Sequence, residues 1–482
     1  TSTFTFPNSI TITDPATSGV QPIEILNGLL ILNDVGADIT LADASTGDFK
    51  LPNTDKSDAS SGSGGLEIAQ GIVRLEGDDT GIILDGLLRI SGGTLDMSDD
   101  SADNGNNFIQ YGTSDQAVIE ITDGSLWVGS QVRRPVTAEA GLLNYRQSGG
   151  NARFGLTAAP ESNRGVFEVL NSGSEFTHTA GEFTIVRENG STTVGSLIIK
   201  PDPGDIDVTG SVITIGSGNT PPNQNDIGID ATVPLNSLVI TGNNNLTAKV
   251  YNSEFEAADL QIDAGGTFDA NGFDLTITGD YLNDGSFING GTDINQQTTL
   301  FPSAGSQQIS GTGSTSFFNL VKDGAGTLTL LQEIDVENNL ELLGGTTNTG
   351  TVAINLQGDM VHDAIHTSDP AGSGIVFAGT DGQNLDTNTS TGEFGTMTID
   401  NSNGVEIPGD GRIFQVNDRV VLGTGVFNIG GNLLVMNQDA VFENETGGTA
   451  RSDFNVNRMI SVNASITDNG VRKIYNDAFS GT

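Results

Sequence analysis

The chain has 482 residues and a formal net charge of −42, from 61 acidic and 19 basic residues. Recognition of phosphate needs lysine and arginine, so this balance argues against nucleic acid and anionic membrane surfaces as partners. The chain contains no cysteine, which excludes disulfide bonds, zinc–thiolate sites and thiol catalysis. No stretch approaches 18 apolar residues, so we expect no insertion into a membrane.

Glycine and small polar residues dominate the composition. The 65 glycines are about twice the average share, while charged residues make up 17% and hydrophobic residues 35% of the chain. This mixture favours short strands closed by turns and disfavours helices. The hydrophobic content is low for a compact globule, but it suits a solenoid whose core is one side chain deep.

The first half of the chain predicts irregular β-structure without any helical period. It starts at Thr1 without a signal-peptide pattern, so we expect either a removed signal peptide or a fragment. Two polar stretches, 46–65 and 216–226, predict protruding loops. The predicted strands are 3–13, 23–26, 29–32, 87–90 before Gly92-Gly93, and 167–170 before Gly173.

An acidic cluster precedes the turn dipeptide Asn104-Gly105. Its four carboxylates fall within eight residues, and oxygen ligands of this density are typical of Ca²⁺ sites. The spacing does not match an EF-hand loop, and the alternative is a solvated acidic loop without metal. Structural Ca²⁺ is therefore the only cofactor that we expect. The candidate ligands are Asp96, Asp99, Asp100 and Asp103.

One segment of the chain is rich in basic and aromatic residues, although the chain as a whole is strongly acidic. Nearly a third of the basic residues lie within about 55 positions, next to the only tryptophan. Aromatic rings stack on sugars, and arginine binds carboxylate or sulfate with two hydrogen bonds, so the group predicts a site for an acidic polysaccharide. The alternative is that these arginines neutralise surrounding acids. The candidate glycan-binding residues are Trp127, Arg133, Arg134, Tyr145, Arg146 and Arg153.

The second half of the chain contains a repeat. Three sets of residues recur at a spacing of 80 positions, and each reads apolar, any residue, apolar and then glycine, as in a strand that enters a turn. A second echo, at a spacing of 76, links Phe301, Gln307 and Ile309 to Phe377, Gln383 and Leu385. The 80-residue sets are Leu260, Leu340 and Val420; Ile262, Leu342 and Leu422; and Gly265, Gly345 and Gly425.

These patterns predict an all-β, elongated repeat protein, and a right-handed parallel β-helix is the favoured fold. Each 80-residue unit contains about eight or nine apolar segments, which predicts roughly three coils of three strands. The alternative is one antiparallel β-sandwich per unit, in tandem. We divide the chain into an irregular region, 1–235, and a repeat region, 236–482, which together form one continuous solenoid.

The repeat region resembles a known family. The series Phe-x-Gly, Gln-x-Ile-x-Gly, Phe-x-Asn-Leu, Val-x-Leu and Leu-x-Leu-x-x-Gly, carried by 301–345 and less closely by 377–425, is similar to repeats of large surface adhesins. These adhesins are secreted by the type IX system of Bacteroidetes-type, gliding bacteria. The resemblance covers 236–482 and implies an extracellular, cell-surface protein with adhesive or polysaccharide-contacting roles in cell adhesion and gliding motility. The sorting domain of the family does not follow 470–482, which suggests part of a longer polypeptide.

Parallel β-helices also host polysaccharide lyases and hydrolases. Asn53-Thr54-Asp55 and Asp78-Asp79 match parts of a polygalacturonase-like site, but its Gly-His-Gly and Arg-x-Lys elements are missing. Of the three histidines, His362 and His366 have a spacing typical of zinc on a helix, although the neighbouring residues predict a turn.

We therefore expect a non-catalytic, structural or adhesive portion of a bacterial surface protein. Its expected partners are polysaccharides or other surfaces, and further chains or domains of a larger surface protein. The alternative is a β-helical polysaccharide lyase or hydrolase.

Overall fold

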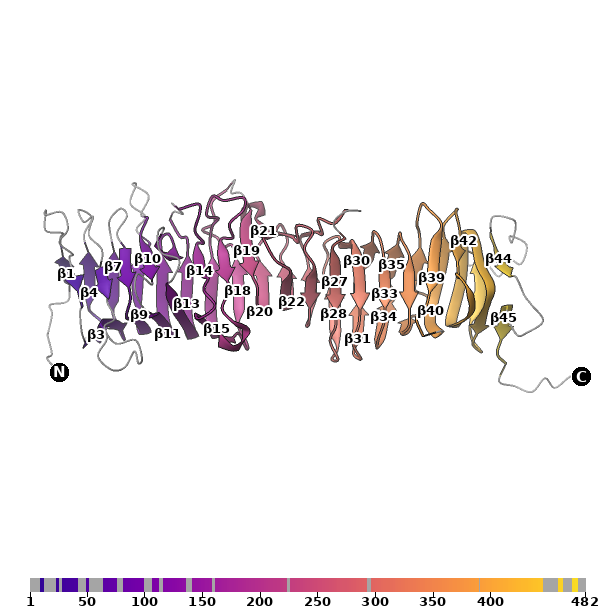
Figure 1. The fold of residues 1–482 in the computed structure, drawn as a ribbon, viewed down its shortest axis with the longest axis horizontal. Helices are drawn as coiled ribbons and strands as arrows, with labels where there is room; N and C mark the ends of the chain where they lie inside the picture. Colours follow the sequence, from indigo (N-terminus) through magenta and orange to yellow (C-terminus); the bar gives the residue numbers. More distant parts are fainter. Residues whose placement is uncertain are drawn as a thin grey trace, which may run out of the picture. The chain divides into compact units, whose positions relative to one another are not determined.

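The structure is a computed structural model of the chain, and it is built almost entirely of β-strands (Figure 1). It describes residues 9–12, 23–25, 28–41, 49–51, 64–75, 81–98, 106–111, 116–135, 141–157, 161–222, 226–292, 296–389, 391–444, 458–462 and 470–475. These ranges contain two short 3-10 helices, η1 (Pro203–Asp205) and η2 (Asn243–Asn245), and no α-helix. Consequently, no helix in the described ranges is long and apolar enough to cross a bilayer.

The chain divides into two compact units. Unit 1 comprises Thr1–Ala257 and Ile262–Asp269, and unit 2 comprises Ala258–Gln261 and Ala270–Thr482. The strands up to the division are β1 (Ser9–Ile12), β2 (Ile23–Glu24), β3 (Gly28–Leu32), β4 (Asp38–Leu41), β5 (Phe49–Leu51), β6 (Gly64–Ile68), β7 (Ile72–Leu75), β8 (Gly81–Leu84), β9 (Leu87–Met97), β10 (Phe108–Tyr111), β11 (Gln116–Val128), β12 (Val132–Arg133), β13 (Leu142–Phe154), β14 (Phe167–Val169), β15 (Glu175–Ile185), β16 (Leu197–Ile199), β17 (Ile206–Asp207), β18 (Val212–Ile215), β19 (Ile227–Ala231), β20 (Leu235–Ile240), β21 (Thr247–Val250), β22 (Phe255–Ile262, shared by both units) and β23 (Thr267–Asp269).

The remaining strands belong to unit 2. They are β24 (Leu275–Ile277), β25 (Tyr281–Asn283), β26 (Ser286–Ile288), β27 (Thr298–Phe301), β28 (Gln307–Ser310), β29 (Ser316–Phe317), β30 (Asn319–Lys322), β31 (Thr327–Leu330), β32 (Ile334–Val336), β33 (Leu340–Leu342), β34 (Thr346–Gly350), β35 (Ala353–Leu356), β36 (Met360–His362), β37 (Ile365–Ser368), β38 (Gly374–Phe377), β39 (Gln383–Asp386), β40 (Thr391–Asp400), β41 (Val405–Glu406), β42 (Asp410–Met436), β43 (Val441–Asn444), β44 (Arg458–Val462) and β45 (Gly470–Lys473).

In unit 1 the chain winds through three faces, and each strand pairs in parallel with a strand of the next coil. The A face contains β3, β6 and the first arms of β9, β11, β13 and β15. The B face contains β1, β4, β7, the second arms of the same long strands, and β18 and β20. The C face runs from β2 through β5, β8, β10, β12, β14, β16, β19 and β21 to β23.

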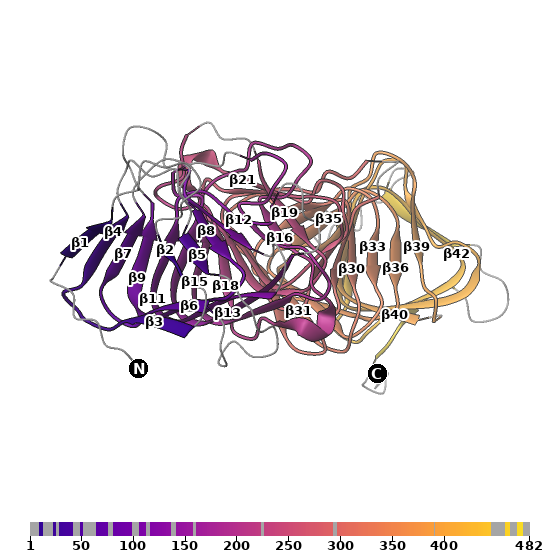
Figure 2. The same ribbon diagram turned by 60° about the vertical axis from the view of Figure 1, so that its left-hand side comes forward.

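Unit 2 has the same construction, with strands of successive coils side by side (Figure 2). Its D face contains β24, β27, β30, β33, β36, β39, β41 and an arm of β42. The E face contains β25, β28, β31, β34, β37 and the first arm of β40. The F face contains β29, β32, β35, β38 and the second arm of β40. This parallel winding confirms the predicted β-solenoid, and the antiparallel sandwich alternative is wrong.

The core of unit 1 contains a cluster of aromatic rings from β13, β14 and β15. Tyr145 and Phe176, one coil apart, stack with 5.5 Å between ring centroids and an interplanar angle of 13°. The ring of Phe167 lies 4.8 Å from Phe154 and 4.9 Å from Phe183. All five side chains are completely buried. Rings in such edge and stacked arrangements stabilise a core beyond their buried area.

Glycines at the corner between the A and B faces let the long strands pass from one face to the next. At Gly150, where φ is +68°, a Cβ atom would lie 2.6 Å from the carbonyl oxygen of Gly124 in the preceding coil. Only glycine accepts both this backbone conformation and this approach. β9 continues through Gly92-Gly93, where the sequence predicts that the strand ends, because a Cβ atom at Gly92 would lie 2.5 Å from the carbonyl oxygen of Ala69 in the preceding coil.

Each repeat of unit 2 contains more strands and coils than the sequence predicts. Gln307 lies in β28 and Gln383 in β39, and Phe301 lies in β27 and Phe377 in β38, a difference of 11 strands in each case. With three strands per coil, 11 strands make three coils and two further strands. The prediction of three coils per repeat is therefore wrong, because each repeat ends one face short of a full coil.

The structure tests several smaller predictions. Gly265, Gly345 and Gly425 have φ angles of +87°, +65° and +98°. The predicted turn is confirmed at Gly265 and Gly345, whereas Gly425 lies inside β42. The predicted loop 46–65 contains β5 and the start of β6, so it is shorter than expected. The loop 216–226 carries no strand in its described part, 216–222 and 226.

Candidate functional site

The predicted glycan-binding residues lie on different faces of unit 1. Trp127 is half-buried on the outer surface of the B face, and its register partners are Asp96 in β9 and Arg153 in β13. The Nε1 atom of Trp127 is buried and has no hydrogen-bond partner among the described residues. Arg153 donates to Asn151 Oδ1 at 3.2 Å and lies 3.6 Å from Glu182. Trp127 and Arg153 are thus the two candidates that the structure brings together.

Arg146 lies on the A face in a ladder of alternating charges. Its Nε and Nη2 donate to the two carboxylate oxygens of Glu175 at 2.9 and 2.6 Å. In the preceding coils Arg89 contacts Glu120 at 2.8 Å and Glu67 at 3.5 Å. The hydrogen bonds from Arg146 lower the pKa of Glu175, and they raise the pKa of Arg146. These contacts are those expected if the arginines neutralise neighbouring acids.

Arg133 and Arg134 lie on the C face and are buried, so the prediction that they contact a glycan is wrong. The guanidinium carbon of Arg133 sits 4.3 Å from the ring centroid of Phe108, and its Nη1 donates to Gln131 at 2.8 Å. Arg134 Nε lies 3.4 Å from Glu168 Oε1, which also accepts the backbone N–H of Arg134 at 2.8 Å. A buried carboxylate requires such partners, because an unpaired charge is costly in a core.

Tyr145 cannot stack on a sugar, because its ring is completely buried in the aromatic core. Its hydroxyl donates to Gln147 Oε1 at 2.6 Å. Burial raises the pKa of Tyr145 well above its usual value, so the hydroxyl remains protonated. The glycan assignment of Tyr145 is therefore corrected to a structural one.

The predicted calcium loop lies largely outside the described residues, which include only Asp96 of the four candidates. Asp96 Oδ2 accepts from Arg74 Nη1 at 3.0 Å, and its Oδ1 accepts from the hydroxyl of Ser98 at 2.7 Å. Within the described ranges, no group of three or more histidine, aspartate or glutamate side chains is arranged to hold a metal ion.

The histidines of unit 2 are buried at the end of one strand and the start of the next, and the bend at Asp363-Ala364 between them confirms the predicted turn and excludes the helical zinc spacing. His362 in β36 and His366 in β37 are completely buried around the ring of Phe394, with centroid distances of 4.3 and 6.2 Å. Burial lowers the pKa of His362 to about 4 and of His366 to about 3. His366 Nδ1 accepts the N–H of Gly395 at 3.3 Å, so its Nε2 carries the proton and donates to Thr349 Oγ1 at 3.0 Å. Their role is therefore structural.

The polygalacturonase-like residues Asn53-Thr54-Asp55 and Asp78-Asp79 lie outside the described residues. The third histidine, His178, is buried in the A face, and its Nε2 lies 3.3 Å from the carbonyl oxygen of Gly181. None of the three histidines contacts a carboxylate within the described ranges, so the structure shows no Ser-His-Asp relay there.

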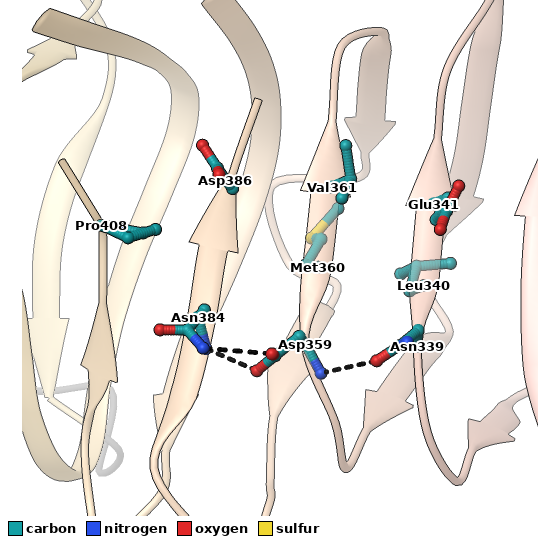
Figure 3. Close-up of a pocket in the computed structure, with 9 residues that line it drawn as sticks. All are labelled: Asn339, Leu340, Glu341, Asp359, Met360, Val361, Asn384, Asp386 and Pro408. Carbon is teal, nitrogen blue, oxygen red and sulfur yellow. Dashed lines mark hydrogen bonds between the residues drawn. The ribbon is translucent and has the colours of Figure 1, made fainter. Parts of the chain in front are cut away.

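A shallow groove of about 370 Å³ lies on the outer surface of the D face in unit 2 (Figure 3). Along one side, Asn339, Asp359 and Asn384 follow one another at the starts of β33, β36 and β39. The N–H of Asn384 donates to Asp359 Oδ1 at 2.7 Å, and the side-chain amide of Asn384 donates to Asp359 Oδ2 at 3.1 Å. The N–H of Asp359 donates to Asn339 Oδ1 at 3.4 Å.

The floor of this groove, which we call the D groove, follows from the register of three strands. Glu341, Val361 and Asp386 are register partners in β33, β36 and β39. The short side chain of Val361 leaves a hollow between the two longer acidic side chains, and Pro408 lines the groove from the next coil. The side-chain carboxylate of Glu341 has no hydrogen-bond partner in the described part of the chain, whereas that of Asp386 accepts from Arg412 at 2.9 Å.

A second groove of about 380 Å³ adjoins the first and shares Asn384 with it. Its lining includes Asn403, Glu406 and Asn428 from the following coils. Sequence reasoning missed both grooves, although a signal for them exists. Asp359 repeats Asp280 at a spacing of 79, and Asn384 repeats Gln308 at a spacing of 76.

Comparison with protein-family models, with curated proteins and with solved structures finds no match for this chain.

Proposed function

We propose that the chain is a non-catalytic, structural and adhesive portion of a bacterial cell-surface protein, which contacts glycans or another surface from outside the cell. The main observation that supports this proposal is that polar side chains on the outer faces form hydrogen bonds and ion pairs between successive coils. Such contacts hold successive coils of a solenoid together. Because most charged groups in the paired ladders already have a partner, few of them remain for catalysis.

The ladders of unit 2 repeat along the chain. Asp280 N–H donates to Asp259 Oδ1 at 2.8 Å, and Gln308 N–H donates to Asp280 Oδ1 at 2.9 Å. The same arrangement recurs 11 strands later, from Asn339 through Asp359 to Asn384. A stalk requires the same hydrogen bond in every repeat, because each repeat unit contacts its neighbours. A catalytic site would instead be one group of side chains at a single place.

Buried glutamines repeat in the same way. Gln307 Nε2 donates to the carbonyl oxygens of Ile277 and Gly279, both at 2.8 Å. Gln383 Nε2 donates to Leu356 and Gly358 at 3.1 and 2.5 Å. Each glutamine therefore satisfies two backbone acceptors of the preceding coil, which would otherwise be buried without partners.

The extracellular location and the link to type IX secretion rest on the resemblance of the repeat motifs to surface adhesins. The acidic composition is compatible with this location, because a strongly negative surface keeps a protein soluble. Glycan contact rests on Trp127, whose half-buried ring lies beside Arg153 on the B face.

The second candidate is a β-helical polysaccharide lyase or hydrolase. It is favoured by the C face of unit 1, where buried acids lie next to buried or partly buried cations. Asp230 Oδ2 lies 2.7 Å from Lys200 Nζ, while its Oδ1 is buried and has no partner in the described ranges. Glu168 sits beside Arg134 on the same face. Buried carboxylates with a cationic partner occur at catalytic sites, although they also anchor loops.

The test is to mix the full chain with neutral and acidic polysaccharides and to measure both co-sedimentation and the release of reducing or unsaturated ends. The proposed function predicts binding without new ends, and loss of part of the binding in Trp127→Ala. Release of new ends that stops in Asp230→Asn or Glu168→Gln would replace the adhesive function by the enzymatic one.

A further inference from the structure

We infer that the D groove of unit 2 binds a glycan chain that carries no acidic groups, either neutral or amine-bearing. The inference rests on the proposed adhesive function and specifies its ligand. It differs from the expectation for the arginine-rich segment of unit 1, which predicts an acidic polysaccharide.

The chemistry of the groove selects against acidic chains. Its lining contains Glu341, Asp359 and Asp386 and no lysine or arginine. Within the described ranges, the only cation that contacts these three acids is Arg412, which is already paired with Asp386. A uronate or sulfate placed here would face like charges in a chain with a formal net charge of −42, and such juxtaposition costs binding energy.

The same lining suits hydroxyl and amine donors. Glu341 is a half-buried carboxylate whose oxygens accept no hydrogen bond in the described part of the chain. Asn339 and Asn384 add amide groups at the edge, Val361 lies on the strand between them, and Pro408 lies beyond Asn384 on the next coil (Figure 3). Convergent polar groups beside a small apolar surface are typical of sites for small polar ligands.

The spacing of the groove fits a polymer. Asn339, Asp359 and Asn384 occupy equivalent positions on three successive coils, and adjacent strands are about 4.8 Å apart. A glycan that lies across the strands would therefore meet one polar position per coil, at a step close to the length of one sugar unit. The adjoining groove, which shares Asn384, extends this track through its register partner Glu406 to Asn428.

The experiment measures binding of three oligosaccharide probes to the full chain by calorimetry: a neutral β-linked glucan hexamer, a chitosan hexamer and a galacturonate hexamer. The variant Glu341→Gln removes the free carboxylate and retains its shape, with little effect on folding because Glu341 has no partner among the described residues. The matched control is Glu333→Gln, an exposed carboxylate outside the groove that accepts from Asn355. Thermal unfolding verifies that both variants are folded.

We expect the neutral or the chitosan probe to bind, and Glu341→Gln to weaken that binding about tenfold, because a hydrogen bond to a charged acceptor is lost. Glu333→Gln is expected to bind as the original chain does. Binding of the galacturonate probe alone, absence of binding by every probe, or equal affinity in Glu341→Gln and the original chain would each overturn the inference. Equal affinity would leave the adhesive function standing, whereas cleavage of a probe would overturn that function instead.

Discussion

The two units are wound in the same way, but several coils of unit 1 use more residues than the short coils of unit 2. On the A face of unit 1, the paired side chains of Arg89 and Glu120 belong to successive coils and have a sequence separation of 31. Along the D face of unit 2, the separation is only 20 from Asn319 to Asn339 and again 20 from Asn339 to Asp359. Three short strands and three turns thus complete a coil of unit 2, whereas this coil of unit 1 uses 11 residues more.

The units also differ in what holds successive coils together. Unit 1 stacks aromatic rings inside and ion pairs outside, whereas unit 2 uses buried amides and outer amide–carboxylate ladders. The difference is one of degree, because unit 2 also has an aromatic cluster around Phe317 and unit 1 also has buried amides such as Gln147. The comparison indicates that aromatic packing and charge contribute more in unit 1, and repeated hydrogen bonds to the backbone contribute more in unit 2. Four sets of substitutions test this difference, and they are arranged from the largest expected effect to the smallest.

The aromatic core of unit 1 is expected to be the most sensitive. Phe167→Ala removes a ring that contacts Tyr145, Phe154 and Phe183, and should lower the free energy of unfolding by about 4 kcal/mol. Phe377→Ala removes a completely buried ring of unit 2, and should cost about 3 kcal/mol, because aromatic pair contacts add to the loss in unit 1. Denaturant unfolding measures both values. Equal losses would contradict the difference between the cores.

The buried histidines of unit 2 should make its stability depend on pH. Both imidazoles have lowered pKa values in the folded chain, about 4 for His362 and about 3 for His366, against about 6.5 in an unfolded chain. Their stabilising contribution is therefore complete above pH 6.5 and declines as the pH falls toward 4, because the unfolded state binds protons first.

Comparison of the original chain with His362→Gln/His366→Gln isolates this contribution, since the carboxylates titrate in both. Between pH 7 and pH 5 the original chain should lose on the order of 3 kcal/mol more than the double variant. Parallel curves for the two proteins would show that the histidines are accessible to protons in the folded state.

The repeated glutamines should matter equally at both of their positions. Gln307→Ala and Gln383→Ala each leave buried carbonyl oxygens without donors, at a cost of about 2 kcal/mol. The measurement is hydrogen exchange of the amides in β28 and β39, with the exposed Gln308→Ala as control. A large effect at one glutamine and none at the other would contradict their equivalence.

The outer ion pairs of unit 1 should contribute least. Glu175→Gln removes the carboxylate that binds Arg146 with two hydrogen bonds, yet partly exposed pairs contribute only about 0.5–1 kcal/mol. The effect should shrink further in 1 M salt, because ions screen exposed charges. Thermal unfolding at low and high salt measures it. A salt-independent loss of several kcal/mol would show that the ladder has a larger role.

Much of the fold could be predicted from the sequence, because the repeated apolar pairs and glycines have the same local role each time. Leu260, Leu340 and Val420 are all completely buried, and the glycine after each has a positive φ. The number of coils per repeat could not be predicted, because one repeat has 11 strands and therefore ends one face short of a complete coil. Leu340 pairs on the D face, whereas Val420 pairs with Met397 on the F face.

The candidate glycan site was predicted less well. Neighbouring residues in a strand point to opposite sides, so Tyr145 and Arg146 could not both face a ligand, and this signal was present in the sequence. The burial of Arg133 and Arg134 had no such signal, because it depends on Glu168, whose sequence separation from Arg134 is 34. The D groove depends on register between coils, which the sequence alone does not determine.

The central claim is that unit 2 stacks short parallel coils in the described register. The natural absence of cysteine allows a direct measurement. Glu341→Cys/Val361→Cys places two thiols on adjacent register partners, where Cα atoms about 4.8 Å apart permit a disulfide bond. The control pair, Leu300→Cys/Glu341→Cys, is separated by two coils. Mild oxidation followed by thiol titration should show loss of both thiols in the first protein and retention in the control. Retention of both thiols in the first protein, or their loss in the control, would contradict the account.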